Sequence, residues 1–263
     1  MSTQALPLQL RDLKLSGFAH HHEALAEQAQ QEHLSYAQYL SMLCERELAL
    51  RYERRVQKWT QEAKLPKSGK TLECFEWDRL SERASHELRR LSQDLSWAER
   101  AENVLFFGPS GTGKTHLAAA LGRELIEQGV RCRLISALQL VQQLQQAKAE
   151  LSLSKAMTQL DKYRVLIIDD IGYVRKSEAE TQVLFEFIAH RYESASLVIT
   201  ANQPFSQWDS IFPDSMMTVA AVDRLLHHGT IIEMLGESYR RASYDERAHS
   251  GSKPGHSAGG VDR

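Results

Sequence analysis

The stretch "NVLFFGPSGTGKT", from Asn103 to Thr115, joins a short apolar run to a glycine-rich turn. The apolar run indicates a buried strand, and the turn fits G-x-x-x-x-G-K-[ST], the pattern of a phosphate-binding loop between a strand and a helix. Backbone N–H groups of such a loop point at phosphate oxygens, and the following helix presents the positive end of its dipole. A chance glycine-rich turn is disfavoured, because strand, loop and helix occur in the expected order. The residues predicted to hold the nucleotide are Gly108, Pro109, Ser110, Gly111, Thr112, Gly113, Lys114, Thr115 and His116.

Two side chains of the loop and two aspartates define the predicted chemistry. Lys114 is expected to place its charge on the β and γ phosphates of ATP, and Thr115 to ligate Mg²⁺. The stretch "VLIIDD" indicates a second buried strand that ends in Asp169 and Asp170. Asp169 is expected to ligate Mg²⁺ with Thr115, and Asp170 to orient or deprotonate the attacking water. The alternative for Asp170 is a cap on the helix that follows.

Two further positions fit the same reaction. Asn202 follows the apolar run "LVITA", so its amide either holds the water or the γ-phosphate, or starts a turn before Gln203. Arg224 lies between apolar residues of a predicted helix. It either pairs with Asp223 or acts as an arginine finger on a neighbouring subunit's nucleotide.

The apolar pattern predicts an α/β fold. Five strand-length apolar runs alternate with helical segments from residue 102 onward, which is typical of a five-stranded parallel sheet covered on both faces. Helical periodicity before that point predicts a long helix over residues 34–61 and a shorter one over residues 8–30, with its weak point at Gly17. The expected organisation is a helical N-terminal domain (1–70), a connecting segment (71–101), an ATPase domain (102–248) and a disordered tail (249–263) rich in Gly, Ser and Pro.

Composition limits the class of protein. The net charge of −2 gives no global basic field, so any surface for nucleic acid must be local. Three widely spaced cysteines without a C-x-x-C pair disfavour a disulfide framework or a structural zinc site. The sequence shows no leader and no apolar run of membrane-spanning length. We therefore expect a soluble, reduced, cytoplasmic protein.

One local stretch is basic. Residues 46–70 carry eight Lys or Arg against three Glu. The stripe formed by Arg51, Arg54, Arg55 and Lys58 runs along one helix face, beside an apolar stripe expected to pack (Leu48, Tyr52, Val56 and Trp59). This basic stripe is a candidate for binding double-stranded DNA through its phosphates with little sequence preference. The alternative is a solvated face that pairs with its own glutamates.

Other conspicuous side chains have simpler explanations. The run His20 to His22 points in several directions on a helix, which disfavours a shared metal ion. Tyr173, Phe205 and Trp208 follow strands, and packing is favoured over contact with DNA or a partner.

Several motifs together resemble one family. "GPSGTGKTHLA", "LIIDDIGY", "VITANQPFSQW" and "VDRLLHHGTIIEMLGESYR" resemble the IstB family, the transposition helper ATPases of insertion sequences, which is similar to DnaC-type helicase loaders among the AAA+ ATPases. The stretch "LSYAQYLSMLCERELALRYERR" resembles the N-terminal helices of the same family. The resemblance implies Mg²⁺-dependent ATP hydrolysis, a homo-oligomer with ATP at its subunit interfaces, binding to duplex DNA, and cooperation with the DDE-type transposase of the same element.

The resemblance also assigns roles. It implies the phosphate and magnesium positions for Lys114 and Thr115, the Walker B carboxylate for Asp169, and the catalytic acid for Asp170, where most AAA+ proteins have Glu. It implies a sensor asparagine at Asn202 and an arginine finger at Arg224. The usual C-terminal lid does not fit into the residues after Leu235, which leaves Arg240 and Arg241 as weak sensor-2 candidates. Two alternative functions remain: a DnaC-like replicative helicase loader, and an ATP-binding scaffold with negligible turnover.

Overall fold

The computed structural model describes residues 5–66, 69–172, 177–210, 215–235 and 238. The chain forms two compact units, Met1–Glu62 and Ala63–Arg263. Several expectations lie outside the described residues, namely those for Tyr173, Arg240, Arg241, the tail 249–263 and the missing lid. None of the described helices is long and apolar enough to cross a membrane.

Three helices make up the described part of the N-terminal unit. The single helix expected over residues 8–30 is wrong, because the chain breaks before Ser16, where Lys14 adopts a left-handed φ of 57°. Gly17 lies inside the second helix instead of breaking it. A Cβ on Gly17 would come within 2.8 Å of the Glu47 Cα, so glycine allows the two helices to approach closely. The helices are α1 (Leu6–Asp12), α2 (Ser16–Gln31) and α3 (Tyr36–Ala63).

A buried carboxylate holds this helix contact. Glu47 on α3 is only 5% exposed, and it accepts hydrogen bonds from the Gly17 N–H at 2.5 Å and from Arg51 Nε at 2.6 Å. Burial alone would raise the pKa of Glu47, but the Arg51 guanidinium and the Gly17 amide outweigh it and lower that pKa. The apolar stripe expected to pack on α3 is wrong at Leu48 and Tyr52, which are 67% and 40% exposed.

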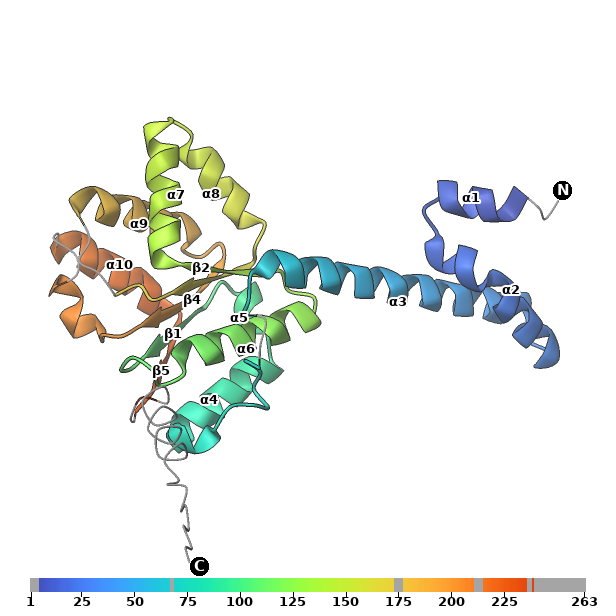
Figure 1. The fold of residues 1–263 in the computed structure, drawn as a ribbon, viewed down its shortest axis with the longest axis horizontal. Helices are drawn as coiled ribbons and strands as arrows, with labels where there is room; N and C mark the ends of the chain where they lie inside the picture. The colour runs from blue at the N-terminus through green and yellow to red at the C-terminus, as the bar shows by residue number, and fades with distance from the viewer. Residues whose placement is uncertain (1–4, 67–68, 173–176, 211–214, 236–237, 239–263) are drawn as a thin grey trace, which may run out of the picture. The chain divides into compact units, whose positions relative to one another are not determined.

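The second unit is built on one parallel sheet, as predicted. Its strands lie in the order β2-β3-β4-β1-β5, and each pairs in parallel with its neighbours (Figure 1). Strands β1 and β4 are buried along their whole length, which explains why their sequences are mainly apolar. The strands are β1 (Asn103–Phe107), β2 (Cys132–Ser136), β3 (Val165–Asp169), β4 (Ser196–Ala201) and β5 (Gly229–Glu233).

Helices cover both faces of this sheet (Figure 1). Helix α6 packs across strands β1 to β4 on one face and contacts α4, whereas α7, α9 and α10 pack on the other face, with α8 against α7 and α9. The helix α8 was not predicted. The helices are α4 (Glu82–Gln93), α5 (Ser96–Glu99), α6 (Lys114–Glu127), α7 (Ala137–Ala149), α8 (Leu153–Asp161), α9 (Glu178–Arg191) and α10 (Ser215–His227), with short 3-10 turns at Trp77–Arg79 and Phe205–Ser210.

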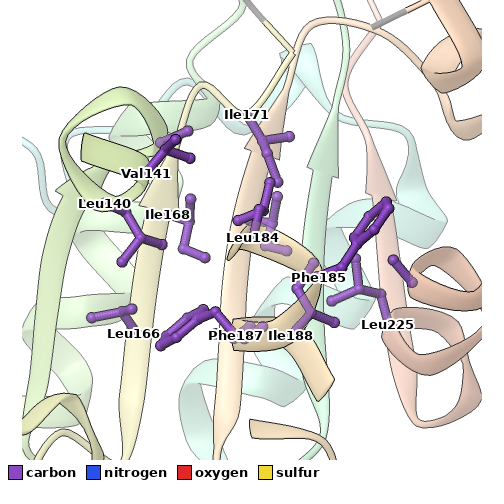
Figure 2. Packing of buried hydrophobic residues seen from close by; sticks show 14 of the residues in the cluster. Leu140, Val141, Leu166, Ile168, Ile171, Leu184, Phe185, Phe187, Ile188 and Leu225 are labelled. Carbon is purple, nitrogen blue, oxygen red and sulfur yellow. The ribbon is translucent and has the colours of Figure 1, made fainter. Parts of the chain in front are cut away.

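The main core lies between the sheet and α7, α9 and α10. Figure 2 shows Leu166 and Ile168 of β3 facing Leu184 and Phe187 of α9, and these side chains are fully buried. Burying each such side chain contributes about 1.5–3 kcal/mol. The core therefore fixes β3 firmly, and with it the direction in which the acidic end of this strand points.

Candidate functional site

The predicted phosphate loop joins β1 to α6. Gly113 caps α6 in a left-handed conformation with φ of 102°, which an L side chain rarely adopts. Lys114 begins the helix, and its ammonium group donates to the carbonyls of Gly108 at 2.7 Å and Pro109 at 2.8 Å. The loop opens on a cavity of about 700 Å³. The residues of the loop and the sheet edge that line it are Ser110, Gly111, Thr112, Gly113, Lys114, Thr115, His116, Asp170, Thr200 and Asn202.

The residues predicted to hold Mg²⁺ lie together. Thr115 Oγ1 donates to Asp169 Oδ1 at 2.9 Å, across the strand β4 that separates β3 from β1. Thr200 Oγ1 on that middle strand donates to the same oxygen at 2.6 Å. Hydroxyl and carboxylate oxygens are the ligands that Mg²⁺ prefers, so this donor set fits the ion. The contribution of Thr200 was not predicted, because nothing in the sequence shows which strand lies between the other two.

Asp170 is held apart from Asp169. Its backbone is left-handed, with φ of 66°, and its N–H donates to Thr200 Oγ1 at 2.8 Å. Asn202 Nδ2 donates to Asp170 Oδ1 at 2.8 Å, so the structure brings the predicted catalytic acid and the predicted sensor together. The alternative that Asp170 caps the next helix is wrong, because Ser177 caps α9.

His116 has a different environment from the one expected of a phosphate ligand. Its Nε2 lies 2.8 Å from the Thr71 carbonyl, and its ring packs edge-on against Phe75, with centroids 5.4 Å apart. Phe75 also lies beside Gly113, where an added Cβ would be 3.0 Å from the ring. His116 thus anchors the segment predicted only to connect the two domains. Cys74, Phe75, Glu76 and Arg79 of this segment line the cavity, as do Gly69 and Lys70 at the end of the predicted N-terminal domain, and no motif predicts these positions.

The chain that follows β5 supports the loop from behind. The Met234 N–H donates to the Phe107 carbonyl at 2.7 Å. The Met234 carbonyl oxygen lies 2.3 Å from the position that a Cβ on Gly108 would take. The first glycine of the loop is therefore in close backbone contact with the segment after β5.

Arg224 does not line the cavity of its own chain. It lies on α10, where its Nη1 donates to the Ala220 carbonyl at 2.9 Å. The alternative of an ion pair with Asp223 is not found among the described residues.

The basic stripe of α3 divides into two parts. Arg51 is paired with Glu47 and donates to the Lys14 carbonyl, and Arg54 donates to Ser16 Oγ at 2.6 Å. These two arginines hold the start of α2 against α3 within the N-terminal unit. Arg55 instead lies over the rings of Tyr52 and Trp59, at 5.5 and 5.4 Å, and Lys58 is exposed.

The remaining aromatic side chains pack as expected. Trp208 is fully buried, and both Phe205 and Trp208 pack edge-on against Phe107, so packing is confirmed for these two residues. His20 and His22 each place Nδ1 near a backbone carbonyl of their own helix. No group of three potential metal ligands in the described ranges includes them.

A parallel sheet ordered β2-β3-β4-β1-β5, with a phosphate loop after β1 and an acidic pair at the end of β3, defines a P-loop ATPase core of the AAA+ class. The crystal structure of the DnaC helicase loader shares this fold, with a TM-score of 0.51 and 20% identity over 58% of this chain and 89% of that one. The sequence model of the IstB-like ATP binding protein family matches residues 8–247, so the chain belongs to that family.

Two curated relatives are similar along most of their length. A putative insertion sequence ATP-binding protein of Sinorhizobium fredii is 47% identical over 249 residues, covering 95% of this chain and 83% of the relative. The insertion sequence IS21 putative ATP-binding protein of Pseudomonas aeruginosa is 38% identical over 235 residues, covering 89% and 88%. Family and fold together identify a nucleotide-binding protein of the AAA+ class.

Proposed function

We propose that this protein is an ATPase that assembles on double-stranded target DNA in an ATP-dependent manner and there recruits or regulates the DDE-type transposase of an insertion sequence. The observation that carries the proposal is the hydrogen-bonded cluster of Thr115, Asp169, Thr200, Asp170 and Asn202 beside the phosphate loop. The names of the relatives, which are insertion sequence proteins, support the role in transposition.

Lys114 and the side chains of the cluster have different roles in hydrolysis. Lys114 binds the β and γ phosphates, and bound Mg²⁺ supplies neutralisation of their developing charge. Asp170 accepts a proton from, or orients, the attacking water, and Asn202 positions the Asp170 carboxylate. In a single subunit the Asn202 amide occupies one Asp170 oxygen, and the carboxylate is shorter than that of Glu. We therefore expect slow turnover before assembly.

Arg224 completes the site from a neighbouring subunit. Its place on α10, outside its own cavity, supports action on the next subunit's γ-phosphate. The test mixes two inactive proteins, Arg224→Ala and Asp170→Asn, at saturating duplex DNA. A mixed oligomer contains interfaces with an intact Asp170 from one protein and an intact Arg224 from the other. Turnover in the mixture above that of either protein alone supports the shared site. A mixture as inactive as its components, or an Arg224→Ala protein with wild-type turnover, contradicts it.

DNA binding is proposed for the part of the α3 basic stripe that does not contact α2. Arg55 and Lys58 are the members of the basic stripe that do not hold α2, so they are the phosphate contacts we propose. Binding of this kind depends steeply on salt and weakly on sequence. Footprints confined to one short sequence at physiological salt would argue against it.

Two other functions make different predictions. A replicative helicase loader would bind a hexameric helicase and prefer single-stranded DNA. The fold shared with the DnaC helicase loader supports this alternative. An ATP-binding scaffold would assemble with ATP but turn over no faster on DNA, and the Asp170–Asn202 contact favours it for the isolated subunit. Electron microscopy with duplex DNA and a slowly hydrolysed ATP analogue separates our proposal from the helicase loader, and the rate of ATP hydrolysis with and without duplex DNA separates it from the scaffold. Discrete duplex-bound assemblies support our proposal, whereas avid helicase binding without duplex binding overturns it.

A further inference from the structure

A histidine pair outside the nucleotide site meets a glutamate at one end of the ATPase unit. His227 is the last residue of α10, His228 lies between α10 and β5, and Glu193 lies between α9 and β4. One potential ligand atom from each side chain lies within 4.8 Å of the other two, and all three residues are exposed. The two imidazole rings are 4.0 Å apart between centroids, so two potential nitrogen ligands lie side by side.

We propose that Glu193, His227 and His228 bind a transition-metal ion, with Zn²⁺ as the preferred ion. Two imidazoles and one carboxylate form a donor set typical of zinc sites with three protein ligands and one water, and nitrogen donors disfavour Mg²⁺ and Ca²⁺. Zinc requires ligand distances of about 2.0–2.2 Å. All three side chains are exposed, so the proposal requires them to close from the present spacing by rotation about their own bonds.

The backbone around the three ligands is already fixed. The Asn103 N–H donates to the His228 carbonyl at 2.9 Å, which ties this histidine to the start of β1. The turn at Glu193 is closed by Ser194 and Ala195, whose N–H groups both donate to the Arg191 carbonyl at 3.0 Å. Binding therefore orders only side chains, and the entropic cost is small for a surface site.

Tyr192 supplies an outer contact of the kind that metal-binding histidines have. Its hydroxyl lies 2.7 Å from Nδ1 of His227. If Nδ1 keeps this contact when the metal binds, Nε2 is left to ligate the ion, and the Tyr192 hydroxyl orients the imidazole ring. Asp223 and Arg224, one turn earlier on α10, carry opposite charges, so together they neither strongly attract nor repel a cation.

The metal would join two parts of the unit that are distant in sequence. It would tie the turn between α9 and β4 to the end of the helix that carries Arg224. Arg224 precedes His227 by three residues and His228 by four. The ion is therefore expected to restrain the end of α10, which sets the position of the arginine. This consequence rests on the proposed function, whereas metal binding itself does not.

The test measures metal binding directly. The full-length protein is prepared without a histidine tag. Cys44 and Cys74 are changed to Ser because both thiols are exposed. This parent protein is titrated with Zn²⁺ in a buffer with excess Mg²⁺, and a chromophoric chelator competes for the Zn²⁺. Co²⁺ is then added in place of Zn²⁺, because its visible absorption reports coordination geometry. We expect one site in the parent protein. The matched control changes His20, His21 and His22 to Ala and should retain it.

Variants of the three ligands decide the outcome. His227→Gln and His228→Gln, alone or together, should abolish the site, and Glu193→Gln should weaken it without loss of fold, as checked by circular dichroism. Tyr192→Phe should weaken binding about 10–100-fold. Unchanged Zn²⁺ affinity in the His227→Gln, His228→Gln double variant overturns the proposal, and so does loss of the site in the His20–His22 control. ATPase activity is recorded separately, so a wrong proposed function would leave the metal result intact.

Discussion

Thr200→Val keeps the shape of a buried side chain and removes the hydroxyl that contacts both aspartates. Thr200 is 1% exposed, and the second methyl group of valine takes the place of that hydroxyl, so both contacts are lost. The Asp170 N–H loses its acceptor, at a cost of about 1–2 kcal/mol. Asp169 Oδ1 loses one of two hydroxyl donors, which costs about 1.5 kcal/mol because Thr115 still donates to it. The sum is about 3 kcal/mol, which lowers the Tm of a unit of this size by about 6–12 °C.

The assays are thermal unfolding and single-turnover ATP hydrolysis, with Thr200→Ser as the matched control. Serine keeps both hydrogen bonds and loses one buried methyl group. The Thr200→Ser variant should therefore lose about 1 kcal/mol of stability, with a correspondingly small fall in Tm, and it should still hydrolyse ATP. Valine should also release the left-handed backbone of Asp170, and hydrolysis should fall far more than ATP binding. If the valine variant melts within about 2 °C of the wild-type protein and hydrolyses ATP at the wild-type rate, the role assigned to Thr200 is wrong.

Three further predictions follow from individual contacts. Asp170→Asn should bind ATP and duplex DNA in equilibrium binding assays but fail to hydrolyse; persistent turnover would place the catalytic acid elsewhere. Arg55→Ala with Lys58→Ala should weaken duplex binding and reduce the slope of log affinity against log salt by about 1.8, whereas Arg51→Ala should mainly lower helix stability measured by circular dichroism. Because the pKa of Glu47 is lowered in the fold, its stabilisation is complete above the ordinary value of 4.5 and is lost as pH falls through the lower folded pKa. Acid unfolding of Glu47→Gln should lack this component, and an unchanged acid profile would show that the buried carboxylate contributes nothing.

The strands and the phosphate loop could be predicted because their signals are local. A buried parallel strand needs an unbroken apolar run, and the loop needs glycines and a lysine at fixed spacing, so β1, β3 and β4 are recognisable without tertiary information. The helix α8 was missed because its apolar positions, Leu153, Met157 and Leu160, span little more than two turns. The break before Ser16 was misplaced because Gly17 is a packing glycine and not a breaking one.

The site could be predicted as far as residue types allow. Thr115, Asp169, Asp170 and Asn202 follow from motif positions at strand ends. The double contact of Thr200 depends on β4 lying between β3 and β1, and chain order alone does not fix that arrangement. The anchoring role of His116 and the structural tasks of Arg51 and Arg54 likewise depend on partners far away in sequence.

The contact between Gly108 and Met234 changes how the effect of a Gly108 substitution on ATP binding should be interpreted. A methyl group at position 108 would overlap the Met234 carbonyl before any nucleotide arrived. Gly108→Ala would therefore push the end of β5 away from β1, and reduced ATP affinity would follow as a secondary effect. The segment around Met234, more than a hundred residues later in the chain, thus requires glycine at position 108. An exchange of that segment between related proteins therefore has to preserve its path across the loop.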